Sequence, residues 1–245
     1  MNAAMYKAVS GSVAQMRRLD VATQNLANLK TQSFKGQHLA FSEMFAAGLD
    51  ADPTGGSVAV AEHRTDFSQG EIQHTGNTFD LALDGEGFFV VNGRSGPRYT
   101  REGSFALASD GTLVNSSGEP MLGVGGPVNE PGRPIRISGN KVEVTPEGIV
   151  RTEQGEMGRL KVVRFADSRV LTKEARGVYR APQTMKPEDA QEYRVLQGSV
   201  EQSNVNPIDA MVALITIHRQ FEAYSKVMQM MDGATARMLS EGARL

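Results

Sequence analysis

The C-terminal stretch of the chain carries an apolar pattern that only an association of long helices can bury. Its apolar residues recur at alternating intervals of three and four positions, and Thr235 is the one interruption. The series consists of Leu214, Ile217, Phe221, Tyr224, Met228, Met231 and Met238. This is the heptad spacing of a helix face that packs on another helix. A helix over residues 207–241 would be about 50 Å long, too long to be buried within a domain of this size, so the pattern predicts partner helices.

This helix is expected to begin at Pro207 and to end near Gly242. Asn206 is a favourable capping residue, and proline suits the first helical position because its missing N–H would be unpaired there anyway. A second apolar stripe covers a neighbouring face of the first turns and consists of Ile208, Met211, Val212 and Ile215. The stripe is the alternative contact surface if the heptad face is not used for assembly.

Residues 2–29 predict a second long helix. Three-four spacing relates Met5, Val9, Ser12, Met16, Leu19, Thr23 and Leu26. The simplest interpretation is an amphipathic helix packed on its own domain. We nevertheless expect the terminal helices to pair as a coiled-coil-like domain. Its assembly contacts would be Met5, Val9, Met16, Leu19 and Leu26 in the first helix, with Leu214, Ile217, Phe221, Tyr224, Met228, Met231 and Met238 in the second.

Between the helices the apolar pattern changes to period two. Short runs rich in apolar residues, such as 88–91, 104–107 and 160–165, are separated by Gly, Asn, Asp and Pro, which indicates antiparallel strands joined by tight turns. The predicted fold class is therefore α+β, with a central antiparallel β-rich domain of short strands. The expected divisions are an N-terminal helix over 1–35, a linker and extended segment over 36–66, the β-rich domain over 67–185, divisible into 67–123 and 124–185, and a return segment with the long helix over 186–245.

Composition excludes several classes of protein. The net charge of -2 and the pI of about 6.1 argue against a nucleic-acid-binding protein. The chain has no cysteine, hence no disulfide and no thiolate site. No apolar run reaches the ~20 residues of a membrane span. Lys7, Arg17, Arg18 and Asp20 interrupt any signal-peptide core, so we expect any export to proceed without a cleaved signal.

No group of residues has the spacing of a catalytic or metal site. The four histidines are scattered, and His218 is better explained by a helix contact than by metal ligation. Asp84-Gly85-Glu86-Gly87 lacks the run of oxygen ligands of a calcium loop and the third glycine of a dinucleotide fingerprint, so a hairpin turn is expected there. We expect a protein that is not an enzyme and has no cofactor and no metal.

The end of the first helix carries a recognisable motif. Asn25-Leu26-Ala27-Asn28, followed by Thr31 and then Phe34-Lys35, resembles the N-terminal signature of bacterial flagellar rod and hook proteins. The chain departs from that signature at Gln24, where the family has Asn, and at Gln32-Ser33, where Pro-Gly or Thr-Gly is usual. Because glycine reaches left-handed torsions more easily than serine, the departure predicts a different turn at Ser33.

The same resemblance continues through the centre and the C-terminal part. An ordered series matches the family: Gln69-Gly70, Thr75-Gly76-Asn77, Asp80-Leu81-Ala82, Gly85-Glu86-Gly87-Phe88-Phe89, Tyr99-Thr100-Arg101, Gly103, Phe105 and Gly118. Gly198-Ser199-Val200-Glu201-Gln202-Ser203-Asn204-Val205-Asn206 resembles the C-terminal signature, with Val200 in place of leucine. Arg219-Gln220-Phe221-Glu222 is most similar to the proximal-rod member.

The resemblance implies a structural subunit of the flagellar basal-body rod. Such a subunit assembles through its terminal helices with other rod subunits and with copies of itself into a helical tube that crosses the periplasm and transmits torque. Its export through the flagellum's own type III apparatus is also implied, whereas a nucleic-acid partner or a membrane span is not. Two alternatives stay open: the distal-rod member of the family, and an enzyme or ligand-binding β domain with a helical oligomerisation stalk.

Overall fold

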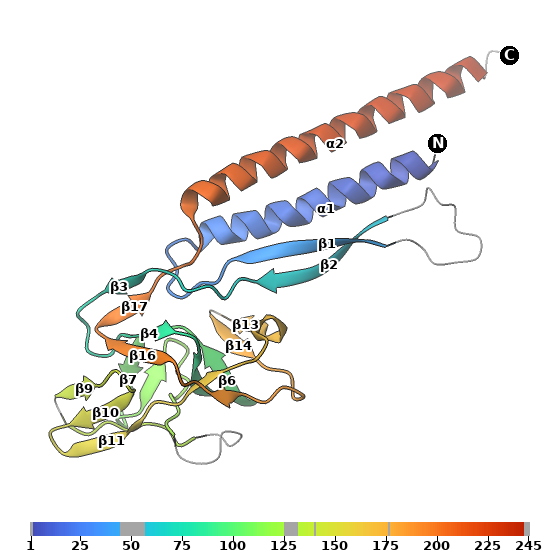
Figure 1. Ribbon diagram of the computed structural model, residues 1–245. Helices are drawn as coiled ribbons and strands as arrows, with labels where there is room; N and C mark the ends of the chain where they lie inside the picture. The colour runs from blue at the N-terminus through green and yellow to red at the C-terminus, as the bar shows by residue number, and fades with distance from the viewer. Residues whose placement is uncertain (1, 45–56, 125–131, 140, 176, 243–245) are drawn as a thin grey trace. The chain divides into compact units, whose positions relative to one another are not determined.

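The computed structural model describes residues 2–44, 57–124, 132–139, 141–175 and 177–242 (Figure 1). The chain divides into two compact units. The helical unit comprises Met1–Asn28, Gly36–Asp66 and Val205–Leu245, and the β unit comprises Leu29–Lys35 and Phe67–Asn204. The divisions between these units fall at residues 28, 35, 66 and 204, whereas the divisions expected from sequence fall at 35, 66 and 185.

The helical unit contains two helices and a hairpin. Helix α1 spans Asn2–Ala27 and helix α2 spans Pro207–Gly242. The predicted start of α2 is confirmed, because the Asn206 side-chain oxygen accepts a hydrogen bond of 2.9 Å from the backbone N–H of Ile208. Strands β1 (Gln37–Met44) and β2 (Ser57–Thr65) pair antiparallel, with a register shift between Ala40 and Phe41.

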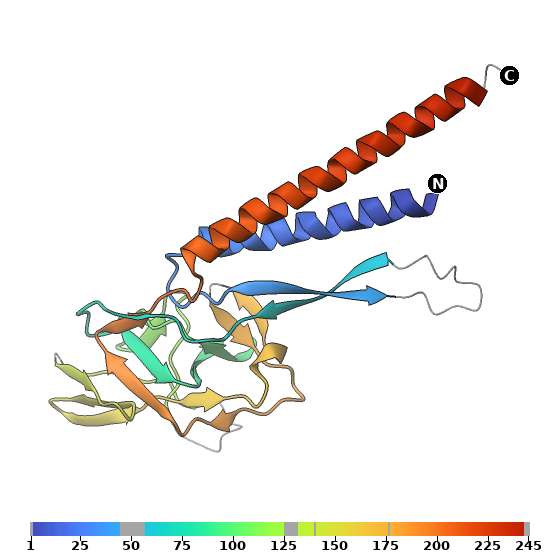
Figure 2. The same ribbon diagram turned by 45° about the horizontal axis from the view of Figure 1, so that its top comes forward.

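The predicted coiled-coil-like pairing of the terminal helices is wrong. In both views the helices draw apart toward the chain termini, so the described part of the chain shows no coiled-coil pairing (Figures 1 and 2). They come close at Gly11, where an added Cβ would lie 2.7 Å from the ring of Tyr224. At this point the ring of Tyr224 packs against a backbone position that has no side chain, which is not the contact of a heptad pair.

Helix α1 buries a different face from the predicted one. Its buried residues are Ala8, Gly11, Ser12, Ala14, Val21, Ala22 and Asn25. Small residues allow close approach of neighbouring backbone, so this face is covered by α2 and by the β1–β2 hairpin, which runs along α1 (Figure 1). The Asn25 side chain fixes the hairpin to α1: its amide donates to the Gln37 carbonyl at 2.8 Å, and its oxygen accepts from the Gln37 N–H at 3.0 Å.

The β unit consists of short antiparallel strands, as the period-two pattern predicted. A six-stranded sheet has the order β13-β14-β6-β5-β12-β15, a three-stranded sheet has the order β11-β10-β9, and β16-β4, β17-β3 and β7-β8 form pairs. The strands are β3 (Ile72–His74), β4 (Leu81–Gly85), β5 (Phe88–Gly93), β6 (Gly96–Thr100), β7 (Phe105–Leu107), β8 (Leu113–Asn115), β9 (Val142–Val144), β10 (Ile149–Thr152), β11 (Gly155–Arg159), β12 (Val162–Arg164), β13 (Thr172–Ala175), β14 (Val178–Arg180), β15 (Glu188–Asp189), β16 (Tyr193–Gln197) and β17 (Ser199–Glu201). A short 3-10 helix, η1, spans Ser168–Val170.

Strand β5 separates two apolar cores. Phe89 and Val91 point into one core and Phe88 and Val90 into the other, so successive residues alternate between the two sides. The first core includes Leu81, Leu113, Met121, Val150 and Leu160, and the second includes Tyr99, Val163, Phe165 and Tyr179. Because both faces of β5 are covered, its sequence is continuously apolar.

The sequence did not predict β16 and β17, which lie in the expected return segment to the long helix. These two strands pair with the first two strands of the β unit: β16 pairs with β4, and β17 pairs with β3. The Glu201 side chain in β17 is fully buried. A short polar run with a buried glutamate gives no local strand signal, because the partner that stabilises it comes from a distant part of the chain.

Candidate functional site

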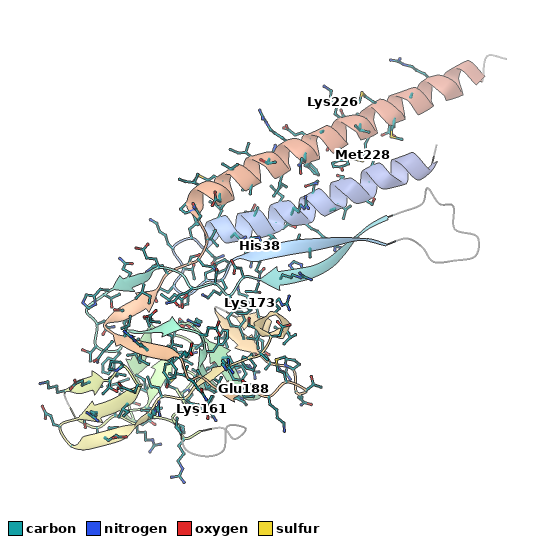
Figure 3. The ribbon with its side chains drawn as sticks, in the orientation of Figure 1. His38, Lys161, Lys173, Glu188, Lys226 and Met228 are labelled. Carbon is teal, nitrogen blue, oxygen red and sulfur yellow. The ribbon has the colours of Figure 1, made fainter. Side chains whose placement is uncertain are left out.

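The predicted heptad face of α2 is half-buried. Leu214, Ile217, Phe221, Tyr224, Met228 and Met231 are all of intermediate exposure, and the side chain of Met238 is outside the described residues. Figure 3 shows Met228 on the side of α2 that faces α1 and Lys226 on the outer side. The chain's own helical unit therefore covers this face only in part.

The predicted face of α1 is divided in the structure. Val9 and Met16 are exposed, Leu19 and Leu26 are half-buried, and the side chain of Met5 is not described. With Val13, the exposed pair forms an outer stripe on α1 whose members are between 42% and 51% exposed. Apolar side chains at such spacing on a helix surface mark a contact surface when they form one continuous patch.

The second apolar stripe of α2 is the most exposed apolar surface of the described chain. Ile208, Met211, Val212 and Ile215 are between 53% and 71% exposed. Their spacing of three and four places them on one face of the helix. This face lies roughly opposite the half-buried heptad face, and not on the neighbouring face expected from the sequence. We call these four residues the outer stripe of α2. His218 lies beside it, with Nδ1 3.6 Å from the Glu222 carboxylate in an exposed i,i+4 pair.

A second feature lies within the β unit, where three segments distant in sequence meet around a buried carboxylate. Lys35 Nζ lies 2.6 Å from Glu201 Oε1, and both side chains are completely buried. The same ammonium donates to the Ser68 carbonyl at 2.6 Å, and the Gly70 N–H donates to Glu201 Oε1 at 2.8 Å. At Gly70 an added Cβ would lie 2.2 Å from the Gln202 carbonyl oxygen, so only glycine fits this approach.

Arg101 and Tyr179 complete the surroundings of this carboxylate. The Arg101 guanidinium lies 3.6 Å from Glu201 Oε2 and donates to the Gly85 carbonyl at 2.8 Å. Burial lowers the pKa of Arg101, and the Glu201 charge opposes that shift. Burial, together with the Glu201 charge, raises the pKa of the Tyr179 hydroxyl. We call Ser33, Lys35, Ser68, Gly70, Arg101, Glu201 and Asn204 the neck cluster.

Ser33 joins the N-terminal signature to this cluster. Its φ of 54° is left-handed, so serine here adopts the torsion that glycine adopts more easily. The buried hydroxyl donates to the Arg101 carbonyl at 2.6 Å, and the Ser33 N–H donates to the Glu201 carbonyl at 2.8 Å. The hydroxyl is thus a specific contact that compensates for the unfavourable torsion.

Two substitutions at Ser33 separate these contributions. Ser33→Ala keeps the strained torsion and leaves a buried carbonyl without its donor, so we expect a loss of about 1–3 kcal/mol in the free energy of unfolding. Ser33→Gly loses the same hydrogen bond but relieves the torsion, so its loss should be about 1 kcal/mol smaller. Urea unfolding of both variants followed by circular dichroism measures the difference. Equal losses would show that the torsion carries no strain.

Tyr179→Phe is expected to leave the β unit as stable or to stabilise it by up to about 1 kcal/mol. The Tyr179 ring is fully buried against Phe67 and Phe88, and its hydroxyl has no hydrogen-bond partner among the described residues. Phenylalanine keeps the ring contacts and removes a buried polar group. Thermal unfolding provides the measurement, and a clear loss of stability would reveal a hydrogen bond that the hydroxyl makes in solution.

The described residues contain no group of three or more His, Cys, Asp or Glu side chains that could hold a metal ion. Among them, no helix has the length and the apolar character needed to cross a membrane.

Comparison with known proteins identifies the family. Residues 196–241 match the model of the flagellar basal body rod FlgEFG protein C-terminal region, and residues 82–152 match the flagellar hook protein FlgE/F/G D1 domain. The chain is 33% identical to the flagellar basal-body rod protein FlgF of Caulobacter vibrioides over 233 residues, 93% of both chains. It is 31% identical to FlgG of Bacillus subtilis over 93% of this chain and 94% of that one. Identity to FlgF of Salmonella typhimurium is 30% over 95% of both.

These matches extend over nearly the whole length of the relatives, so they concern the terminal helices as well as the β unit. The matched C-terminal region contains Glu201 of the neck cluster and both apolar faces of α2. The chain therefore belongs to the flagellar rod and hook protein family, as a structural rod protein of the flagellar basal body.

Proposed function

We propose that this rod protein is a subunit of the proximal rod and assembles with its neighbours through the outer faces of its two helices. The proximal position is supported by the FlgF relatives, which match over nearly the full chain, and by Arg219-Gln220-Phe221-Glu222 in α2. Its role is mechanical, since the rod transmits torque from the motor.

The observation that carries the assembly proposal is the outer stripe of α2. Burying apolar surface stabilises a contact by about 25 cal/mol per Å². Single exposed apolar side chains are common on protein surfaces, whereas four large ones in one stripe indicate a contact surface. The occupant is a neighbouring rod subunit, whose α1 presents the outer stripe of Val9, Val13 and Met16. Contact between different faces of successive subunits is heterologous and builds an open helical array.

The half-buried heptad face is part of the same proposal. Leu214, Ile217, Phe221, Tyr224, Met228 and Met231 retain exposed apolar area that further neighbours can cover in a packed tube. Met5, Leu19, Leu26 and Met238 complete the proposed interface. The flagellar export apparatus is the other proposed partner, because a subunit of the rod has to reach an assembly outside the cytoplasm.

Locating the subunit in intact basal bodies tests the proposal. A strain that lacks the gene should not swim, and a copy with a compact tag in an exposed turn of the β unit, after Ser117, should restore motility. Electron microscopy of basal bodies from that strain should then show the tag density on the proximal rod. Density on the hook, or on no axial structure, would contradict the proposal.

A distal-rod position is the second candidate. It is favoured by the FlgG relative of Bacillus subtilis, which matches over as much of the chain as the FlgF relatives do. The same images decide between the two, because the tag density would then lie on the distal part of the rod.

A further inference from the structure

The chain passes between the helical unit and the β unit at four points, because Leu29–Lys35 and Phe67–Asn204 belong to the β unit. Force that is carried along the chain from the helices therefore enters the β unit through residues near 29, 35, 67 and 204. Within the β unit these entry segments are bonded to one another. The Asn204 amide donates to the Ser68 carbonyl at 3.2 Å and to its hydroxyl at 3.0 Å, and the Asn204 N–H donates to the Phe34 carbonyl at 3.2 Å.

The Lys35–Glu201 ion pair lies at the same place. It joins residues 166 positions apart in sequence, and Lys35 also holds the Ser68 carbonyl. The Ser33 N–H and the Gly70 N–H both donate to Glu201, the first to its carbonyl and the second to its carboxylate. The three parts of the β unit that adjoin the helical unit, around Lys35, Gly70 and Asn204, are thus linked through the buried residue Glu201.

The position of the pair on the strand ladder matters for mechanics. Strands β3 and β17 are antiparallel, with Glu201 opposite Ile72 and Ser199 opposite His74. The chain enters β3 after Gly70 and leaves β17 before Asn204, so both free ends lie at the Glu201–Ile72 end of the ladder. Pulling the two ends apart would open the ladder like a zipper, one pair at a time, starting at Glu201. The ion pair and the Gly70 hydrogen bond lie where this opening would begin.

We propose that the neck cluster is a mechanical clamp that prevents force from the helices from unzipping the β unit. The proposal rests on the mechanical role of the rod protein. Separating Lys35 from Glu201 breaks an ion pair whose two side chains are fully buried, where the attraction between the charges is stronger than in water. A clamp of this kind resists force at the entry segments and has little effect on force applied elsewhere.

Single-molecule force spectroscopy on the full-length monomer tests the direction dependence. The chain has no cysteine, so handles can be attached at chosen positions. One pair of handles at the two termini loads the neck cluster through the helices. A second pair, introduced by Ser117→Cys and Glu153→Cys, pulls on exposed turns of the β unit that lie outside the neck cluster. The variant is Glu201→Gln, which removes the charge and keeps the shape.

The matched control is Glu188→Gln. It makes the same chemical change in an exposed ion pair of the same unit, where Arg164 lies 2.9 Å from Glu188 and both side chains are about half-exposed. If Glu201→Gln does not fold, the double variant Lys35→Met with Glu201→Gln replaces it. The single variant leaves both Lys35 and Arg101 without a counter-charge, whereas the double variant leaves only Arg101 so.

With the terminal handles, Glu201→Gln should raise the unfolding rate of the β unit at fixed force by at least about tenfold, the factor that corresponds to ~1.4 kcal/mol. With handles at residues 117 and 153 the rise should be clearly smaller than with the terminal handles, and Glu188→Gln should change neither rate by more than about twofold. Equal acceleration along both directions would reduce the cluster to a general stabiliser and overturn the clamp. An unchanged rate with the terminal handles would also overturn it. Neither result depends on rod assembly, which the basal-body images test separately.

Discussion

Replacing Met211 and Ile215 together by aspartate is expected to abolish rod assembly and leave the monomer folded. Both side chains are more than half-exposed, so the monomer loses little packing. Aspartate lowers helix propensity by only about 0.6 kcal/mol per site. In the assembled rod each substitution removes about 1.5–3 kcal/mol of apolar burial and places a carboxylate in a dry contact. The loss recurs at every subunit.

The measurement combines swimming assays with electron microscopy of basal bodies from cells whose sole copy is the double variant. Cells should be non-motile and should lack rods beyond the point where this subunit enters. The purified variant should have the circular dichroism spectrum of the wild-type protein. Its control is Ala213→Asp with Gln220→Asp, which adds the same charge to exposed positions away from the stripe and should permit assembly. A motile Met211→Asp/Ile215→Asp strain would show that the outer stripe faces water in the rod.

The heptad face gives a different expectation. Phe221 and Met228 are half-buried within the helical unit, so aspartate at both positions should disturb the monomer's helices as well as assembly, while the β unit stays folded. Comparing the two double variants therefore separates assembly contacts from internal packing. Only the outer-stripe variant should lose assembly with an undisturbed monomer.

Local patterns in the sequence predicted the elements whose cause is local. The short apolar run from Phe88 to Val91 is typical of a strand buried on both faces, and Asn206 has the side chain that caps a helix. Both depend on residues within a few positions of one another. The family signatures also locate Lys35 and Glu201, but they do not show that the two residues form an ion pair.

The failures have a common physical reason, which is that competing partners decide the outcome. Val9 and Met16 have heptad spacing, yet Ala8, Gly11 and Ala14 form the buried face of α1 because small residues let other backbone come nearer. The ring of Tyr224 packs against Gly11, which has no side chain with which to interlock. Likewise β17 contains a buried glutamate that is stable only beside Lys35, which lies 166 positions away.

Removing the charge of Glu201 is expected to cost the β unit about 3–5 kcal/mol of its free energy of unfolding, as for other buried pairs broken on one side. Glu201→Gln leaves the Lys35 ammonium and the Arg101 guanidinium buried together without a counter-charge. Lys35→Met should cost less, because the Glu201 carboxylate keeps Arg101 at 3.6 Å. Urea unfolding followed by far-ultraviolet circular dichroism gives both values.

The double variant Lys35→Met with Glu201→Gln completes a thermodynamic cycle. Its loss should be smaller than the sum of the two single losses, because each single variant carries the penalty of an unpaired buried charge that the double variant largely avoids. Domain stabilities are only about 5–15 kcal/mol, so Glu201→Gln alone should bring the β unit close to unfolding at 37 °C. Additive losses would mean that Lys35 and Glu201 stabilise the β unit independently, and the ion pair would then have no role in holding the neck cluster together.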